Sequence, residues 1–126
     1  MTSLRIEKAN TLKDKPKDNE LVFGTQFTDH MFAMDYAPDK GWYDPRIVPY
    51  GPIETSPASM VFHYGQAIFE GLKAYRDQNG RVVTFRPRDN YARLNRSAER
   101  MCIPPIDEES ALAAMMELLR LEKDWV

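Results

Sequence analysis

The sequence predicts an α+β fold in which two to three helices cover a mainly antiparallel sheet with a hairpin. Apolar and polar residues alternate in residues 21–27 and 30–36, which is typical of strands. An Asn-Gly pair at 79–80 separates two further β-prone runs, and two amphipathic segments follow it. Helices packed against one face of such a sheet form a common layered architecture.

The first twenty residues, 1–20, are predicted to form a charged, disordered N-terminal tail. Their second half, TLKDKPKDNE, mixes charges around Pro16 and offers too little apolar surface to drive its own folding. A folded domain with a single core is expected over residues 21–126, and its first elements are paired strands at 21–27 and 30–36.

Residues 38–57 are predicted to be a loop, because they hold five of the nine prolines of the chain. Proline is excluded from helix interiors and has no amide donor for a central strand. The only strand expected in this segment is an edge strand at 47–50.

A short helix is predicted over residues 59–70, where apolar residues recur at helical spacing and Gly71 is suited to the C-terminus. The runs LKAYR and RVVTF then flank the turn Asp77–Gly80. Asn-Gly within that turn favours a hairpin, because both residues tolerate a positive φ.

Two longer helices are expected to follow. The first begins after Pro87, with Asp89 as its cap, and ends before Pro104. Its apolar face would consist of Tyr91, Leu94, Ala98 and Met101. The second helix runs from about residue 108 to residue 123, and its acidic first turn complements the helix dipole.

Composition excludes several classes of function. The 126 residues carry a net charge of -2, so no basic excess favours nucleic acid or an anionic membrane. No run approaches the roughly 18 apolar residues of a membrane span, and the first twenty residues lack an apolar signal region. The single cysteine, Cys102, allows no internal disulfide, which favours a reducing, cytoplasmic location.

The sequence contains no P-loop, dinucleotide fingerprint, C-x-x-C or H-E-x-x-H motif. Neither His30 nor His63 has a second ligand at metal-binding spacing, so both are expected to be structural hydrogen-bonding residues. Cys102 is expected to be a small core residue rather than a nucleophile.

One local anion site can be proposed from the residues alone. Arg93 lies in the early part of a predicted helix, where the amide groups and the dipole favour phosphate. The alternative is a solvated arginine face, which Arg93 would share with Arg96 and Arg100. Three aromatic residues are similarly open to two interpretations, core or pocket wall: Phe23, Tyr64 and Phe69.

Two blocks, HYGQAIFEGLKAYR (63–76) and FRPRDNYARLNRSAERMCIP (85–104), resemble the small N-terminal domain of branched-chain amino-acid aminotransferases. These are pyridoxal-phosphate enzymes of fold type IV. The similarity extends upstream through FGTQFTDHM (23–31) and Gly41-Trp42, and so covers nearly all of the chain after the tail. FEGLKAYR with FRP distinguishes this group from the D-amino-acid aminotransferases and aminodeoxychorismate lyases.

The resemblance implies roles for individual residues. Arg93 matches the arginine that holds the phosphate of pyridoxal 5'-phosphate, for which a guanidinium fork is well suited. Phe23 and Phe69 match aromatic walls of the pocket for the branched side chain, and Tyr64 matches a tyrosine contributed across a homodimer interface. The complete enzyme would move an amino group from leucine, isoleucine or valine to 2-oxoglutarate.

The resemblance also implies that no catalytic residue lies in this chain. The Schiff-base lysine of the family belongs to a second, C-terminal domain, and Lys73 occupies a different place in the motif. The small domain is therefore expected to be incomplete at its C-terminal end, and this chain alone to be inactive. The alternatives are a non-catalytic interaction module of the same fold, or a D-amino-acid aminotransferase or aminodeoxychorismate lyase.

Overall fold

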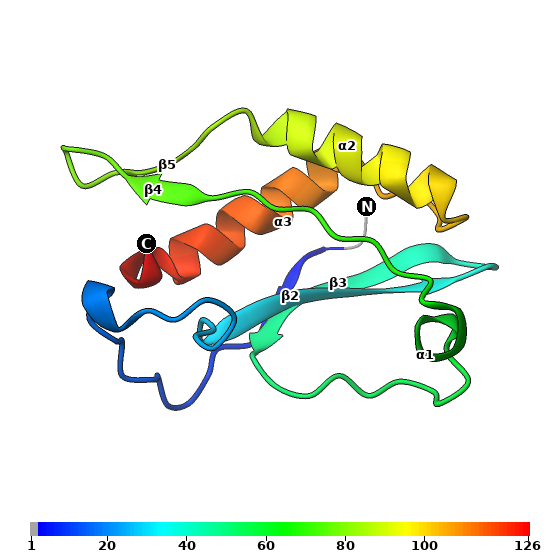
Figure 1. Ribbon diagram of the computed structural model, residues 1–126, viewed down its shortest axis with the longest axis horizontal. Helices are drawn as coiled ribbons and strands as arrows, with labels where there is room; N and C mark the ends of the chain where they lie inside the picture. The colour runs from blue at the N-terminus through cyan, green and yellow to red at the C-terminus, as the bar shows by residue number, and fades with distance from the viewer. Residues whose placement is uncertain (1–2) are drawn as a thin grey trace. The chain divides into compact units, whose positions relative to one another are not determined.

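The computed structural model describes residues 3–126, and the chain divides into two compact units where the sequence predicted one core. The first unit contains the chain up to Gly51 together with Ala114–Val126, and the second contains Pro52–Ala113. Residues 3–126 form three α-helices and two small sheets, each of which contains an antiparallel pair of strands, so the predicted α+β class is confirmed (Figure 1). Among the described residues, no helix has the length and apolar character that crossing a membrane would require.

The first unit is built on a three-stranded sheet with the order β1-β3-β2. Strands β2 (His30–Ala37) and β3 (Gly41–Pro49) form the long antiparallel ribbon in Figure 1, and β1 (Arg5–Ile6) pairs in parallel with β3. Ile47, in the central strand, is completely buried. The strand predicted at 30–36 is confirmed.

A bulge explains how β3 can be central despite its prolines. Ala33 pairs with Arg46 and Asp35 pairs with Tyr43, so one residue of β2 lies opposite both Asp44 and Pro45. Asp44 has φ 48°, and the missing amide of Pro45 falls where the ladder is already interrupted. The prediction of a loop over 38–57 with an edge strand at 47–50 is therefore wrong for Gly41–Pro49.

The N-terminal residues also differ from prediction. The backbone N–H of Glu7 donates to Ile47 O at 2.9 Å. The N–H of Ala9 donates to His30 Nε2 at 2.8 Å, and the N–H of Lys13 donates to Asp29 Oδ1 at 2.7 Å. Hydrogen bonds to distant parts of the chain thus attach a segment that has little apolar surface of its own. Residues 5–13, predicted to belong to a disordered tail, are mostly exposed but are held by these hydrogen bonds. Residues 1–2 of the predicted tail lie outside the described residues.

The remaining N-terminal elements are a 3₁₀ turn, η1 (Asp18–Glu20), and a series of turns. The predicted strand at 21–27 is wrong. Gly24 there has φ 77°, and Thr25 N donates to Val22 O at 3.2 Å, which closes a tight turn.

The second unit begins with a helix that is shorter than predicted. Helix α1 (Met60–Tyr64) ends at Gly65, which has φ 61°, instead of continuing to residue 70. A left-handed glycine at this position stops the helix, so the following residues run on as an irregular segment, 65–73.

The predicted hairpin is confirmed. Strands β4 (Ala74–Arg76) and β5 (Val82–Thr84) are antiparallel. The carboxylate of Asp77 closes the turn by accepting from Asn79 N at 2.9 Å and Arg81 N at 2.8 Å.

Helix α2 (Pro87–Arg100) is confirmed with changes at both ends. Arg86 (φ 46°) precedes Pro87, and Asp89 lies within the first turn, so the prediction that Asp89 is the cap is wrong. At the other end Cys102 has φ 54°. Ile103 N donates to Ala98 O at 2.9 Å and Cys102 N donates to Glu99 O at 3.2 Å, which is a Schellman motif.

Cys102 therefore occupies the left-handed position that glycine usually fills after a helix. Its side chain is exposed, so the expected core placement is wrong. The backbone hydrogen bonds at the end of α2, rather than apolar packing, account for the conformation of Cys102.

Helix α3 (Glu108–Leu121) begins in the second unit, where it was predicted to begin, and ends in the first, followed by η2 (Lys123–Trp125). Within the second unit, the amide of Asn95 exchanges two hydrogen bonds with the backbone of Ile106, at 2.9 Å and 3.0 Å. Tyr91 OH donates to Ala111 O at 3.2 Å. These contacts connect α2 to the loop and first turns of α3.

Candidate functional site

Helix α2 exposes the basic face that the sequence predicted. Arg93, Arg96 and Arg100 are all exposed on it. Arg93 differs from a freely solvated arginine, because its side chain contacts Glu70 in the irregular segment that follows α1. An element with no regular structure is thus joined to a helix by one charged pair.

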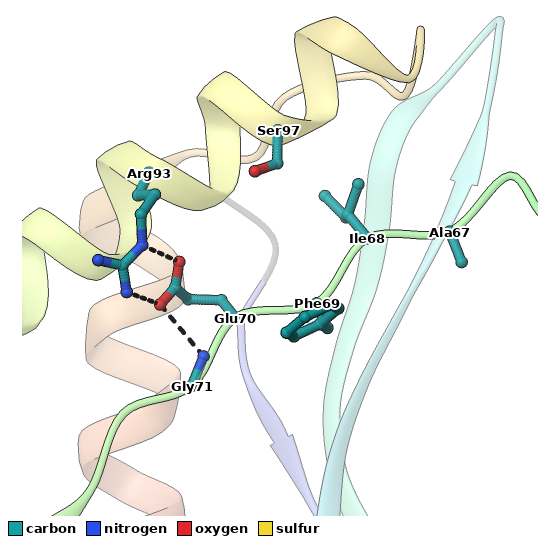
Figure 2. A pocket seen from close by; sticks show the side chains of 7 residues that line it. All are labelled: Ala67, Ile68, Phe69, Glu70, Gly71, Arg93 and Ser97. Carbon is teal, nitrogen blue, oxygen red and sulfur yellow. Dashed lines mark hydrogen bonds and ion pairs between the residues drawn. The ribbon is translucent and has the colours of Figure 1, made fainter.

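The Arg93–Glu70 pair is bidentate. Arg93 Nε donates to Glu70 Oε2 at 2.8 Å, and Arg93 Nη2 donates to Glu70 Oε1 (Figure 2). One edge of the guanidinium therefore lies against both carboxylate oxygens, an arrangement that is stronger and more directional than a single contact.

Further donors fix the carboxylate of Glu70. Gly71 N and Asn90 Nδ2 each donate to Glu70 Oε1 at 3.1 Å, and Asn90 Nδ2 also donates to Gly71 O at 3.0 Å. The hydrogen bond from Arg93 is the main reason that the pKa of Glu70 is lowered to about 2, and the Asn90 and Gly71 donors contribute. Glu70 is therefore ionised at neutral pH.

A pocket of about 430 Å³ lies beside this pair. Figure 2 shows its lining, which comes from residues 67–71 on one side and from α2 on the other. The lining residues are Ala67, Ile68, Phe69, Glu70, Gly71, Arg93 and Ser97. Apolar side chains and a pair of opposite charges, Arg93 and Glu70, line the same open pocket, which suits a small ligand that has both an apolar and a charged part.

The structure brings together two of the four predicted site residues. Phe69 and Arg93 line this pocket, and the side chain of Phe69 is almost fully exposed, at 94%. Tyr64 is exposed at the end of α1 in the same unit but does not line the pocket. Phe23 is exposed in the first unit, and Lys73 is not among the lining residues.

Five of the seven lining residues were not predicted as site residues, and two of the five, Glu70 and Ser97, have polar side chains. Glu70 lies inside the quoted motif FEGLKAYR, yet no spacing rule connects it with Arg93, 23 residues later. Ser97 follows Arg93 by one helical turn and so shares its side of α2, which the helical period could have indicated.

Neither histidine belongs to this pocket. His30 is buried and bonded to Glu122, and His63 Nε2 lies 2.8 Å from Pro57 O. Within residues 3–126, no three His, Cys, Asp or Glu side chains are grouped so that they could hold a metal ion.

Comparison with known proteins gives a consistent result, although no family model matches this chain. The similar sequences are aminotransferases. The chain is 56% identical over 124 residues to branched-chain-amino-acid aminotransferase 2 of Bacillus subtilis and 58% identical over 123 residues to branched-chain-amino-acid transaminase 1 of the same strain. It is 48% identical over 104 residues to a branched-chain-amino-acid aminotransferase of Mycolicibacterium smegmatis.

These matches cover 98%, 96% and 82% of this chain, respectively. The chain spans about a third of the length of the two Bacillus relatives, 34% and 35%. These matches confirm the resemblance to branched-chain amino-acid aminotransferases that the motifs indicated. The resemblance covers a part of such an enzyme.

Proposed function

We propose that this chain is the N-terminal part of a branched-chain amino-acid transaminase, which transfers the amino group of leucine, isoleucine or valine to 2-oxoglutarate. The observation that supports this most strongly is the 56–58% identity to two such enzymes over almost the whole chain. Because the chain spans only about a third of these relatives, the activity would belong to the whole protein.

The donors at the pocket fit a phosphate-bearing cofactor. Arg93 already holds an oxyanion, the carboxylate of Glu70, with two N–H groups, so its guanidinium is shaped for such a ligand. Arg93 would hold the phosphate of pyridoxal 5'-phosphate, which supplies an electron sink for amino-group transfer. By the resemblance, the lysine of the cofactor site lies in a second domain, and the present chain alone would be inactive.

The substrate side chain would contact the apolar part of the site. Phe69 is an exposed aromatic wall beside Arg93, and the resemblance assigns Phe23 to the same pocket. An apolar wall would accept leucine, isoleucine and valine with modest selectivity, since one methylene changes binding by only about 1–3 kcal/mol. Three further points stay predictions from the sequence. They are the homodimer, to which Tyr64 would contribute, the cytoplasmic location, and the small domain at residues 21–126.

The test uses the native protein. An antibody against this chain would capture the gene product from its source cells, and a denaturing gel would give its mass. The captured protein, supplied with pyridoxal 5'-phosphate, leucine and 2-oxoglutarate, is expected to be far heavier than 14.6 kDa and to form glutamate. The isolated 126-residue chain, under the same conditions, is expected to form none.

Two results would redirect the proposal. A native product of 14.6 kDa without activity would favour the non-catalytic interaction module. A heavy product that uses D-alanine or aminodeoxychorismate in place of leucine would assign the chain to one of the related enzymes of the same fold type.

A further inference from the structure

We infer that Glu70 is a positioning residue for Arg93: its carboxylate fixes the guanidinium so that the remaining N–H donors of Arg93 are directed to a phosphate group in the pocket. This inference rests on the proposed function, which assigns Arg93 to the cofactor phosphate.

Glu70 is the residue that holds the Arg93 side chain. Both hydrogen bonds of the Arg93 side chain within the described part of the chain go to Glu70. The Arg93 side chain is otherwise open to solvent, with 58% of its surface exposed. A long side chain in that position would sample many rotamers if its partner were removed, and a ligand would then have to order it on binding.

Glu70 is itself held in place by several contacts. Only 11% of its side-chain surface is exposed, and its Oε1 accepts from Gly71 N and Asn90 Nδ2 in addition to Arg93. Asn90 lies on the same helix as Arg93 and also binds Gly71 O. The carboxylate is therefore hydrogen-bonded both to its own segment and to α2. A carboxylate fixed in this way restricts the rotamers of the Arg93 guanidinium that pairs with it.

Glu70 occupies only one edge of the Arg93 guanidinium. It takes Nε and Nη2 of Arg93, so the N–H donors of the opposite edge, which includes Nη1, stay available for a second oxyanion. Ser97 lies one helical turn further along, on the same side of α2, and its hydroxyl lines the same pocket (Figure 2). A phosphate could thus accept from Arg93 while the Glu70 pair stays intact.

Repulsion between Glu70 and a phosphate is the opposing effect. A phosphate on the opposite edge of the guanidinium would have the positive charge of Arg93 between itself and Glu70, and that charge offsets the repulsion. We therefore expect the gain from a preordered guanidinium to exceed the repulsion. Preordering of Arg93 strengthens phosphate binding and repulsion by Glu70 weakens it. The direction in which a Glu70 substitution changes the affinity therefore shows which effect is larger.

The experiment measures equilibrium binding to the recombinant full-length protein that contains this chain, stripped of cofactor. Wild type, Glu70→Gln and Glu70→Asp are each titrated with pyridoxal 5'-phosphate and with pyridoxal, which lacks the phosphate. Both variants are expected to bind pyridoxal 5'-phosphate roughly 3- to 10-fold more weakly and to bind pyridoxal as wild type does. Aspartate keeps the charge but is too short for the bidentate contact.

A matched control is available in a second arginine of α2, Arg88, whose partner Glu109 lies on α3. Glu109 makes a similar bidentate pair with Arg88, at 2.8 and 3.0 Å, and neither residue lines the pocket. Glu109→Gln is expected to leave both titrations unchanged.

Several outcomes would overturn the inference. Tighter binding of pyridoxal 5'-phosphate by Glu70→Gln would mean that Glu70 competes with the phosphate. Equal weakening for both ligands would mean a merely structural role, and wild-type binding by Glu70→Asp would mean that the bidentate contact is unimportant. Should Glu70→Gln not fold, Glu70→Asp decides.

The inference and the proposed function can fail separately. If Arg93→Ala binds pyridoxal 5'-phosphate as wild type does, the assignment of Arg93 to the phosphate is wrong. If Arg93→Ala weakens binding and the Glu70 variants do not, only the positioning role is wrong.

Discussion

The buried imidazole of His30 is hydrogen-bonded through Nδ1 to the carboxylate of Glu122, which is 92 residues later in the chain. Its Nε2 accepts from the backbone N–H of Ala9 at 2.8 Å, so the proton of the neutral ring is on Nδ1, which donates to Glu122. Glu122 also accepts from Asp29 N at 3.2 Å, and the Asp29 carboxylate accepts from the Trp125 indole at 2.8 Å. This cluster joins three distant parts of the first unit.

We predict that Glu122→Ala lowers the free energy of unfolding by about 2–4 kcal/mol, because it leaves the buried His30 donor and the Asp29 amide without their acceptor. Urea unfolding at pH 7 would measure the loss. The matched control is Glu117→Ala, five residues earlier and within α3, which removes only a solvent-exposed contact with Arg120 and should cost less than about 1 kcal/mol. Equal losses for the two variants would contradict a structural role of the buried cluster.

We predict that Cys102→Gly raises the free energy of unfolding by about 0.5–1 kcal/mol. Glycine relieves the strain of a side chain at φ 54°, and this gain exceeds the extra entropy that glycine loses on folding. Cys102→Val should lower stability, because a branched side chain tolerates this backbone conformation poorly. Cys102→Ala isolates the loss of the thiol, and a glycine variant no more stable than the alanine variant would argue against strain.

We predict that Phe69→Ala, in the full-length protein, lowers kcat/KM for leucine roughly tenfold and for alanine less than twofold. A lost apolar wall affects only a substrate side chain that reaches it. Steady-state assays with both amino donors would check this. Phe85→Ala serves as the control, since Phe85 is also exposed but does not line the pocket. Equal losses for leucine and alanine would indicate a folding defect instead.

We predict that Arg93→Ala returns the pKa of Glu70 from about 2 toward its ordinary value of 4.5, which carbon NMR of the carboxyl group would follow. The folded-state pKa lies below the unfolded one, so the ionised pair stabilises the fold fully above pH 4.5, and this contribution is lost as the pH falls through about 2. The pKa of Glu109, which Arg88 lowers, should not change. A Glu70 pKa that stays at about 2 in the variant would show that Arg93 is not its cause.

Local sequence chemistry was sufficient for the elements that depend on near neighbours. The hairpin follows from the turn beginning at Asp77, whose side chain closes it, and α2 and α3 follow from apolar residues at helical spacing. The motifs likewise identified Arg93 and Phe69, which line one pocket. These features could be predicted because the interactions that create them lie within a few residues along the chain.

Only the tertiary structure decided the features that depend on distant partners. Strand β3 is central because β1 and β2 pair with both of its edges, and residues 5–13 are attached by hydrogen bonds to Asp29, His30 and Ile47. The hydrogen-bonded pair of Glu70 and Arg93 likewise joins two residues that are 23 positions apart in the chain. The sequence by itself determined the family resemblance and the local elements. The fold decided which backbone and charged groups are partners, because a contact between distant residues leaves no periodic pattern in either segment.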